Sequence, residues 1–580
     1  MDLAYKKIIC KGNAFAMELL KLAKYYNGGW SIKWEHFNVL RIVLIAAMAG
    51  LIYGYDSGIN YSYLPTINLE DDLGNTVWGD KKLATSDIKL TEVLASFFPA
   101  GILISINCSA ACMSITMDRM NWIEFAVWIL IYGVILEVIA FNIWILLMAR
   151  FLVIMGIAGT LFASPIYIAE VSPYMIRGAL VSTFYMFVAG GQLLAYLMSI
   201  AFSKVPGTWR WMFALEGVLV MVHYRLLNLL PESPKVLFRT DRECAIILLK
   251  FLYPYGAENE IQALQHSVKD VDHKKEVFRA GFEGILKPYR NDTAFRRGLI
   301  VGIGCLLAQQ LVGINMVMHY TPTLLQMAGY DTTKITNSPI IPGFSAFGYL
   351  FSIFFVDRLG RRKLLIISII GIVISLWMLS CAFKNETSMN SSSIGIGKSP
   401  LDLNTDFKGS TSFAGATVYM GWHIVPMIKG SNQSSTFHLE TDHHGMSYND
   451  SSFLAFSGLQ LYTYFYSLGM GIVPWIINSE IYAFKYAIVG TSVALAASLV
   501  SNVLTSLLLS VISEALGSSN TFLLLCLVSC IVGVFILLFV PETKGLRMED
   551  IEGMLLDTET CNRSKQAIKD DCENLNDQMC

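Results

Sequence analysis

Residues 231–233 read Pro-Glu-Ser and residues 541–543 read Pro-Glu-Thr, and each triplet directly follows a long apolar segment. The two triplets lie 310 residues apart, which is also the separation between Glu170 and Glu480, each at the end of another apolar segment. A sequence repeated at one fixed separation indicates an internal duplication. The chain is therefore predicted to consist of two similar halves.

A third repeated pair has a different separation. Asp118-Arg119 and Asp357-Arg358 lie 239 residues apart, which is 71 fewer. The loop 384–452 contains 69 residues, so one insertion in the second half accounts for all three separations. A parallel duplication of this kind is typical of transporters that bind their substrate between two halves.

The composition predicts an integral, multi-pass membrane protein. Of the 580 residues, 54% are apolar and only 15% are charged, whereas soluble domains are about 25% charged. A helix needs about 20 mostly apolar residues to cross a bilayer. The fold class that we predict is an all-α membrane protein with twelve transmembrane helices in two pseudo-symmetric six-helix halves. The twelve spans are centred near residues 49, 102, 131, 157, 190, 220, 309, 347, 373, 465, 498 and 530.

The distribution of Lys and Arg predicts the orientation. Segment 231–297 carries twelve of them and loop 384–452 carries four, so the former is expected in the cytosol together with both termini. The predicted organisation is a cytosolic N-terminal segment 1–38, a six-helix half 39–230, a cytosolic linker 231–297, a six-helix half 298–540 with the extracytosolic loop 384–452, and a cytosolic tail 541–580.

Loop 384–452 also carries four Asn-x-Ser/Thr sequons, at Asn385, Asn390, Asn432 and Asn449. Such sequons are acceptors for N-glycosylation on the extracytosolic side. Their position agrees with the charge rule, and we expect the plasma membrane rather than the vacuolar membrane.

Charge balance and motifs exclude several classes of function. The 43 basic and 45 acidic residues give a net charge of −2, so there is no basic excess for a nucleic-acid partner. The chain has no Walker A, GxSxG, HExxH or CxxC motif. We therefore expect no enzyme activity, no cofactor and no metal.

Asp56 lies inside the first apolar segment, and Arg150 lies near the start of the fourth. A charged side chain within a bilayer is costly unless it is paired or faces water. We therefore expect Asp56 to pair with Arg150, and we interpret Asp56 as a carboxylate that couples transport to proton movement. A purely structural ion pair is the alternative.

Amide side chains in the spans predict a site for an uncharged, polyhydroxylated ring, because an amide offers a donor and an acceptor without charge. An aromatic side chain can also stack on the apolar face of such a ring. The candidate binding residues are Gln192, Gln309, Gln310, Asn315, Tyr320 and Trp475. Helix–helix hydrogen bonding by the amides and interfacial anchoring by the tryptophan are the alternatives.

Charged residues at the predicted cytosolic helix ends suggest a gate. These residues are Glu170, Arg177, Glu232, Arg358, Arg361, Arg362 and Glu480. We expect the arginines after the eighth span to meet Glu480, and Arg177 to meet Glu232. Such pairs would break when the gate opens. Solvated charges that anchor the helix ends are the alternative.

Several strings together resemble the sugar-porter family of the major facilitator superfamily. They are Gly54-Tyr-Asp56, residues 150–156 and 165–178, Pro231-Glu-Ser-Pro234, Gln309-Gln-Leu-Val-Gly-Ile-Asn315, Asp357-Arg-Leu-Gly-Arg-Arg362 and Pro541-Glu-Thr-Lys-Gly545. Within the family, residues 178–183, 206–212, 469–480 and 517–523 are similar to the plant inositol transporters.

This resemblance implies proton-coupled symport of myo-inositol or a related cyclitol by alternating access, with the polyol or sugar, a proton and membrane lipid as partners. It implies that Asp56 is the proton site with Arg150 as its partner. It also implies that the candidate amides and Trp475 line the substrate cavity. Asn502, which remains at a further family position in the eleventh span, is expected to bind the substrate as well.

Two other functions stay open. The same amides suit a hexose or pentose in a proton symporter. Residues 118–122, 483–487 and 498–499 depart from the family pattern, which favours a non-transporting sensor or a degenerate paralogue.

Overall fold

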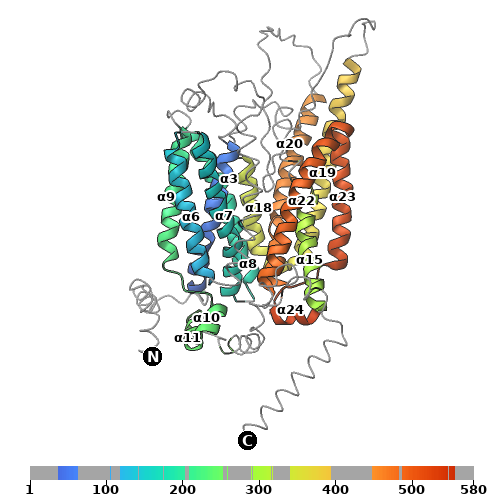
Figure 1. The fold of residues 1–580 in the computed structure, drawn as a ribbon. Coiled ribbons are helices and arrows are strands. Elements are labelled where there is room, and N and C mark those ends of the chain that lie inside the picture. The colour runs from blue at the N-terminus through green and yellow to red at the C-terminus, as the bar shows by residue number, and fades with distance from the viewer. Residues whose placement is uncertain are drawn as a thin grey trace, which may run out of the picture.

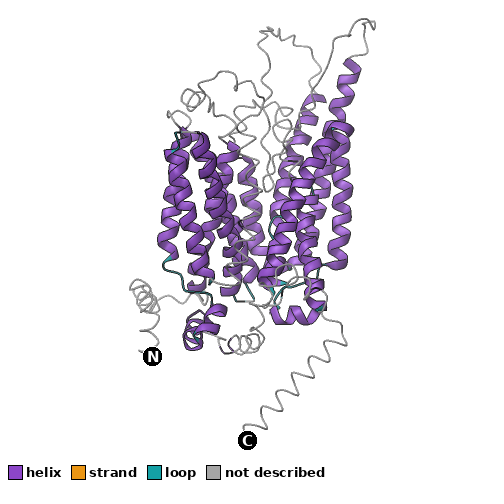
Figure 2. Cartoon of the chain, viewed as in Figure 1, coloured by secondary structure: helices purple, strands orange, loops and turns teal. Residues whose placement is uncertain are grey.

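The computed structural model shows a bundle of long helices with short helices at one end (Figure 1). It describes residues 37–62, 105, 118–141, 143–173, 175–202, 208–252, 258, 261, 289, 292–314, 317, 340–393, 447–482, 486–546 and 548–555. Within these residues the regular structure is entirely helical (Figure 2).

The N-terminal part of the chain forms one side of the bundle. Its described helices are α3 (Phe37–Ser62), α6 (Arg119–Ile139), α7 (Ile143–Val171), α8 (Arg177–Phe202) and α9 (Thr208–Leu227). Because they are apolar around most of their circumference, they suit an environment in which every backbone polar group must be satisfied within the helix.

The C-terminal part forms the other side. Its described helices are α15 (Thr293–Leu311), α18 (Ile340–Leu359), α19 (Arg361–Ser393), α20 (Ser447–Phe465), η3 (Tyr466–Met470), α21 (Val473–Glu480), α22 (Ala487–Leu516) and α23 (Ser518–Phe539). The π-helical turn η3 interrupts the path from α20 to α21, and such turns are frequent at functional sites.

Three short helices lie at one end, which we call the motif end: α10 (Pro234–Thr240), α11 (Arg242–Leu252) and α24 (Met548–Leu555) (Figure 1). Arg297 at the start of α15 donates to the carbonyl of Leu555 at 3.0 Å, which fixes α24 against the bundle. The motif end therefore contains the segments that follow the last predicted span of each half, which are α9 and α23.

Helices α3 and α8 approach each other closely because glycines lie at their interface. A Cβ at Gly54 would lie 1.9 Å from the carbonyl oxygen of Val188, and one at Gly191 would lie 2.1 Å from that of Leu51. Small residues let helix backbones approach in membranes, where no hydrophobic force drives helices together. This contact holds Asp56 of α3 beside α8.

The predicted spans agree well with the observed helices. Eleven of the twelve predicted centres fall on described helices, and the one near residue 102 lies outside the described residues. Seven described helices are long and apolar enough to cross a membrane. The structure extends α19 to Ser393 and begins α20 at Ser447, so the helices continue into the predicted loop 384–452. Polar Asn, Ser and Thr residues there ended the apolar pattern without ending the helix.

Candidate functional site

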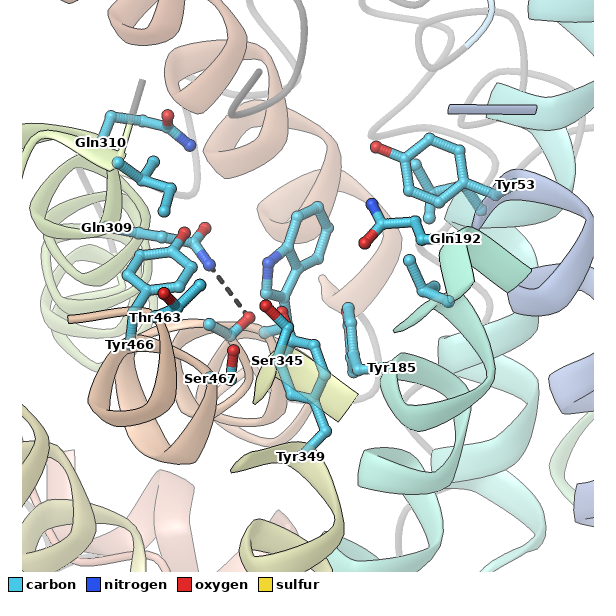
Figure 3. A pocket seen from close by; sticks show the side chains of 15 residues that line it. Tyr53, Tyr185, Gln192, Gln309, Gln310, Ser345, Tyr349, Thr463, Tyr466 and Ser467 are labelled. Carbon is cyan, nitrogen blue, oxygen red and sulfur yellow. Dashed lines mark hydrogen bonds between the residues drawn. The ribbon is translucent and has the colours of Figure 1, made fainter. Parts of the chain in front are cut away.

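A cavity of about 100 Å³ lies between the two sides of the bundle. In Figure 3, Tyr53, Tyr185 and Gln192 face it from α3 and α8, and amides and hydroxyls face it from the opposite side. Its lining residues are Tyr53, Leu161, Tyr185, Val188, Gln192, Gln309, Gln310, Ile314, Ser345, Tyr349, Thr463, Tyr466, Ser467, Gly471 and Trp475. No charged side chain occurs among these described lining residues, so the cavity suits a neutral ligand with several hydroxyl groups.

Gln309 is fixed by the interrupted helix opposite it. Its Nε2 donates to the carbonyls of Met470 and Gly471, both at 3.0 Å, and Figure 3 draws the bond to Gly471. These carbonyls lie where η3 ends and the regular helical pattern is broken. Gln309 therefore serves the helix packing that we considered as its alternative role, while its side chain still lines the cavity.

Gln310 belongs to a small amide network with α22. Asn502 Nδ2 donates to Gln310 Oε1 at 2.8 Å, and Gln310 Nε2 lies 3.4 Å from Ser498 Oγ. Asn502 is not among the residues that line the cavity. Asn502 is expected to bind the substrate, but in this structure it holds the side chain of Gln310 instead.

Gln192 joins the cavity to α3. Its Nε2 donates to Ser57 Oγ at 3.3 Å, and Ser57 directly follows the fully buried Asp56. The cavity residue Gln192 is therefore connected to the Asp56 carboxylate through its hydrogen bond to the neighbouring Ser57.

Aromatic rings close the cavity between the two sides. Trp475 of α21 and Tyr185 of α8 have ring centroids 5.8 Å apart. The Tyr185 hydroxyl is buried and has no hydrogen-bond partner among the described residues. A ligand in the cavity can satisfy it, since an unpaired buried polar group costs free energy.

The structure forms the predicted ion pair between Asp56 and Arg150. Arg150 Nη1 lies 2.7 Å from Asp56 Oδ1 and 3.1 Å from Glu137 Oε1 of α6, and all three side chains are buried. Glu216 of α9 is also fully buried, and neither of its carboxyl oxygens has a hydrogen-bond partner within the described part of the chain. Sequence reasoning gave no role to Glu137 or Glu216, because an acid in an apolar segment does not reveal which helix it will face.

At the motif end, the C-terminal side carries the predicted contact between Arg361 and Glu480. Arg361 Nη2 lies 3.0 Å from Glu480 Oε1, and Thr543 donates to Glu480 Oε2 at 2.8 Å. Glu542 accepts from the backbone N–H of Arg361 at 2.9 Å. Arg358 is exposed and makes no ion pair with Glu480 in the described residues, while Arg362 donates to the carbonyl of Leu537.

The N-terminal side repeats this arrangement. Arg119 Nη2 lies 3.2 Å from Glu170 Oε1, and Ser233 donates to Glu170 Oε2 at 2.5 Å. Glu232 accepts from the backbone N–H of Met120 at 3.1 Å, as Glu542 does on the other side. Burial raises the pKa of Glu232 from 4.5 to about 7, in spite of these backbone hydrogen bonds.

Two details differ from the sequence prediction. The expected pair of Arg177 with Glu232 is not formed among the described residues. Arg119 pairs with Glu170 instead, and Glu232 accepts from the backbone N–H of Met120. Arg119 is the structural counterpart of Arg361, not of Arg358, so the repeat separation here is 242 rather than 239. Aligning Asp118-Arg119 with Asp357-Arg358 therefore shifts the two halves by three residues relative to the structural repeat.

One hydrogen bond crosses between the two sides at the motif end. The backbone N–H of Ala179, in the first turn of α8, donates to Asp357 Oδ2 at 2.7 Å, while Arg361 Nη1 lies 2.7 Å from Asp357 Oδ1. A Cβ at Gly178 would lie 2.5 Å from Asp357 Oδ1, so the Asp357 carboxylate would have to shift if residue 178 carried a larger side chain. Asp357 thus connects the N-terminus of α8 to the opposite side.

The structure does not test two of the candidate binding residues. Asn315 and Tyr320 lie outside the described residues. Within the described part of the chain, no group of three or more His, Cys, Asp or Glu side chains is arranged to hold a metal ion.

The sequence did not predict the tyrosines that line the cavity, which are Tyr53, Tyr185, Tyr349 and Tyr466. An aromatic residue that lines a cavity gives the same sequence pattern in an apolar segment as one that only packs against its neighbours.

Comparison with known proteins places this architecture. A family model described as "Sugar (and other) transporter" matches residues 42–398 and 409–555. "Probable inositol transporter 2" of Arabidopsis thaliana is 34% identical over 91% of this chain and 93% of its own length, and the human "Proton myo-inositol cotransporter" is 27% identical over 90% of this chain and 82% of its own. The solved structure of the major facilitator superfamily proton:xylose symporter XylE has a TM-score of 0.65 at 21% identity and covers 90% of this chain and 100% of that one, which shows the fold. The chain belongs to this family of sugar and other transporters and is an integral, multi-pass membrane protein with the major facilitator fold.

Proposed function

We propose that the chain is a proton-coupled symporter of myo-inositol or a related cyclitol, acting by alternating access at the plasma membrane with both termini in the cytosol. The observation that carries the proposal is the link from an uncharged, amide-lined and hydroxyl-lined cavity, through Gln192 and Ser57, to the buried pair of Asp56 and Arg150. Substrate and proton would thus bind at neighbouring sites. Relatives named for inositol transport and for proton–inositol cotransport support the same interpretation.

The cavity chemistry explains the choice of substrate class. Myo-inositol carries a hydroxyl on every ring carbon and no charge. Gln192, Gln310 and Tyr185 offer donors and acceptors to such hydroxyls, and Trp475 offers a flat apolar surface for a ring face. A proton on Asp56 would weaken its attraction to Arg150, which frees the neighbouring helices to move.

The two charge networks at the motif end complete the proposed cycle. Arg119 with Glu170 and Arg361 with Glu480 hold the helix ends together on each side. We propose that they act as the cytosolic gate with the other candidate gating residues, and that they rearrange when the two halves, 39–230 and 298–540, move apart at that end.

The test is uptake of labelled myo-inositol in voltage-clamped oocytes at acidic and at neutral external pH, after surface delivery has been measured. We expect a saturable inward current that grows on acidification, and an Asp56→Asn variant that exchanges inositol but has lost the pH dependence. Unchanged pH dependence in Asp56→Asn would contradict the coupling role.

Competition separates the alternatives. Stronger inhibition by hexoses or pentoses than by inositol isomers would assign the cavity to sugars. Binding without flux of either class in a surface-delivered protein would support a sensor or a degenerate paralogue.

A further inference from the structure

The buried cluster around Arg150 contains more acids than one arginine can neutralise. Asp56 of α3, Glu137 of α6 and Glu216 of α9 are fully buried, and Arg150 is the cation that faces them among the described residues. If all three carboxyls were ionised, the cluster would hold two negative charges that Arg150 does not balance. Burying unpaired charge is strongly unfavourable, so the cluster needs protons as well as Arg150.

Two of the carboxylates compete for the same atom. Arg150 Nη1 is 2.7 Å from Asp56 Oδ1 and 3.1 Å from Glu137 Oε1. The second oxygen of Glu137 has no hydrogen-bond partner among the described residues. Glu137 is therefore placed to receive the guanidinium after a small movement, and it has an unused oxygen with which to do so.

Three further described residues face the cluster, and none of them forms an ion pair with Arg150, so the exchange involves Asp56 and Glu137. Tyr55 donates its hydroxyl to the carbonyl of Met212 at 3.2 Å. Phe213 presents its ring to Arg150, with 5.8 Å between the guanidinium carbon and the ring centroid. Glu216 makes no ion pair with Arg150, and neither of its carboxyl oxygens has a hydrogen-bond partner in the described residues.

We propose that Glu137 is a positioning residue that takes over Arg150 when Asp56 is protonated. The proton from outside adds to the Asp56 carboxylate and Arg150 keeps its own proton. Glu137, which is ionised before and after this step, takes over the ion pair with Arg150. Asp56 can then stay neutral without leaving an unpaired guanidinium inside the bundle. This inference rests on the proposed function and adds the group that stabilises the protonated state.

The experiment compares Glu137→Gln with wild type and with Glu124→Gln. Glu124 lies on the same helix α6, is half-buried and belongs to no ion pair of the cluster, so it serves as a matched control. Without a second carboxylate, Arg150 remains with Asp56, and a higher proton concentration is required to neutralise Asp56. We expect the external pH of half-maximal inositol uptake to fall by about one unit in Glu137→Gln, which is about a tenfold change in proton concentration. Glu124→Gln should match wild type, and Glu137→Asp should restore most of the wild-type profile.

A second readout does not require transport. Infrared spectroscopy of the purified protein follows the carbonyl band of protonated carboxyl groups as pH is varied, and Asp56→Asn identifies the Asp56 component. We expect its midpoint to move to lower pH in Glu137→Gln. A folded, surface-delivered Glu137→Gln with an unchanged uptake profile, or an unchanged Asp56 midpoint, would overturn the inference. Absence of pH-dependent uptake in wild type would instead contradict the proposed function, and the infrared midpoint would still decide the role of Glu137.

Discussion

At the scale of single residues, the Tyr185 hydroxyl gives the sharpest test of the cavity. It is buried, lines the cavity and has no hydrogen-bond partner among the described residues. A Tyr185→Phe change removes that hydroxyl and keeps the ring that packs against Trp475. Since a hydrogen bond contributes about 1 kcal/mol, we expect KM for inositol to rise about fivefold, with a thermal stability that is equal to or slightly above that of wild type because an unpaired buried hydroxyl is removed. Uptake kinetics and thermal unfolding measure the two quantities.

The matched control for this change is Tyr462→Phe. The Tyr462 hydroxyl donates to the carbonyl of Val312 at 3.2 Å, so its loss should lower stability more than it changes KM. The idea that Tyr185 contacts substrate would be wrong if Tyr185→Phe lowered stability and left KM unchanged.

The cavity residues that could be predicted from the sequence are Trp475 and several side chains whose polarity is unusual for their surroundings. Gln192, Gln309, Gln310 and Asp56 are polar in apolar segments, and the structure places each at or beside the cavity. Tyr185 gave no such signal. Which neighbour each amide would bind could not be derived either, because that depends on the angle at which distant helices meet.

At the scale of helices, the contact between α3 and α8 positions Asp56 and predicts opposite results at two neighbouring glycines. A Cβ at Gly191 would lie 2.1 Å from the carbonyl oxygen of Leu51, whereas a Cβ at Gly190 would meet nothing within 4 Å. We expect Gly191→Ala to destabilise the protein by about 1–3 kcal/mol, because the two backbones must separate. Gly190→Ala should be neutral or slightly stabilising, since alanine favours the helix.

Thermal unfolding and surface delivery of the two variants provide the measurement. Equal effects of Gly190→Ala and Gly191→Ala would show that helix propensity, and not the close approach of α3 and α8, determines the result.

The helices themselves were largely predictable, because about 20 apolar residues in a row have few alternatives to a membrane span. The register at the motif end was not. Asp118-Arg119 and Asp357-Arg358 look alike in sequence, yet Arg119 and Arg361 occupy equivalent places against Glu170 and Glu480. Similar dipeptides could not reveal a three-residue shift that only the partner acids define.

At the scale of the whole molecule, a hydrogen bond joins the two sides of the bundle at the motif end. Asp357 of the C-terminal side accepts the N–H of Ala179 at the start of α8. Asp118, its apparent repeat partner in sequence, precedes α6 and makes no side-chain cap to its own helix. A carboxylate at a helix N-terminus is favoured by the helix dipole and by the unsatisfied N–H groups there. The contact therefore stabilises the arrangement in which the two sides meet at this end.

Removing this contact should shift the molecule toward the arrangement that is open at the motif end. In an Asp357→Ala variant, we expect the amides at the start of α8 to exchange hydrogen about tenfold faster, because the N–H of Ala179 loses its acceptor and the two sides separate more often. Hydrogen–deuterium exchange measured by mass spectrometry on the peptide around Ala179 reads this directly. The neighbouring side chain of Arg358 cannot replace the lost carboxylate, because a guanidinium has no hydrogen-bond acceptor. The control is Asp118→Ala, which should leave hydrogen exchange at the start of α8 unchanged. Equal protection of α8 in Asp357→Ala and wild type would mean that the charge networks within each side, rather than this single bond across them, keep the motif end closed.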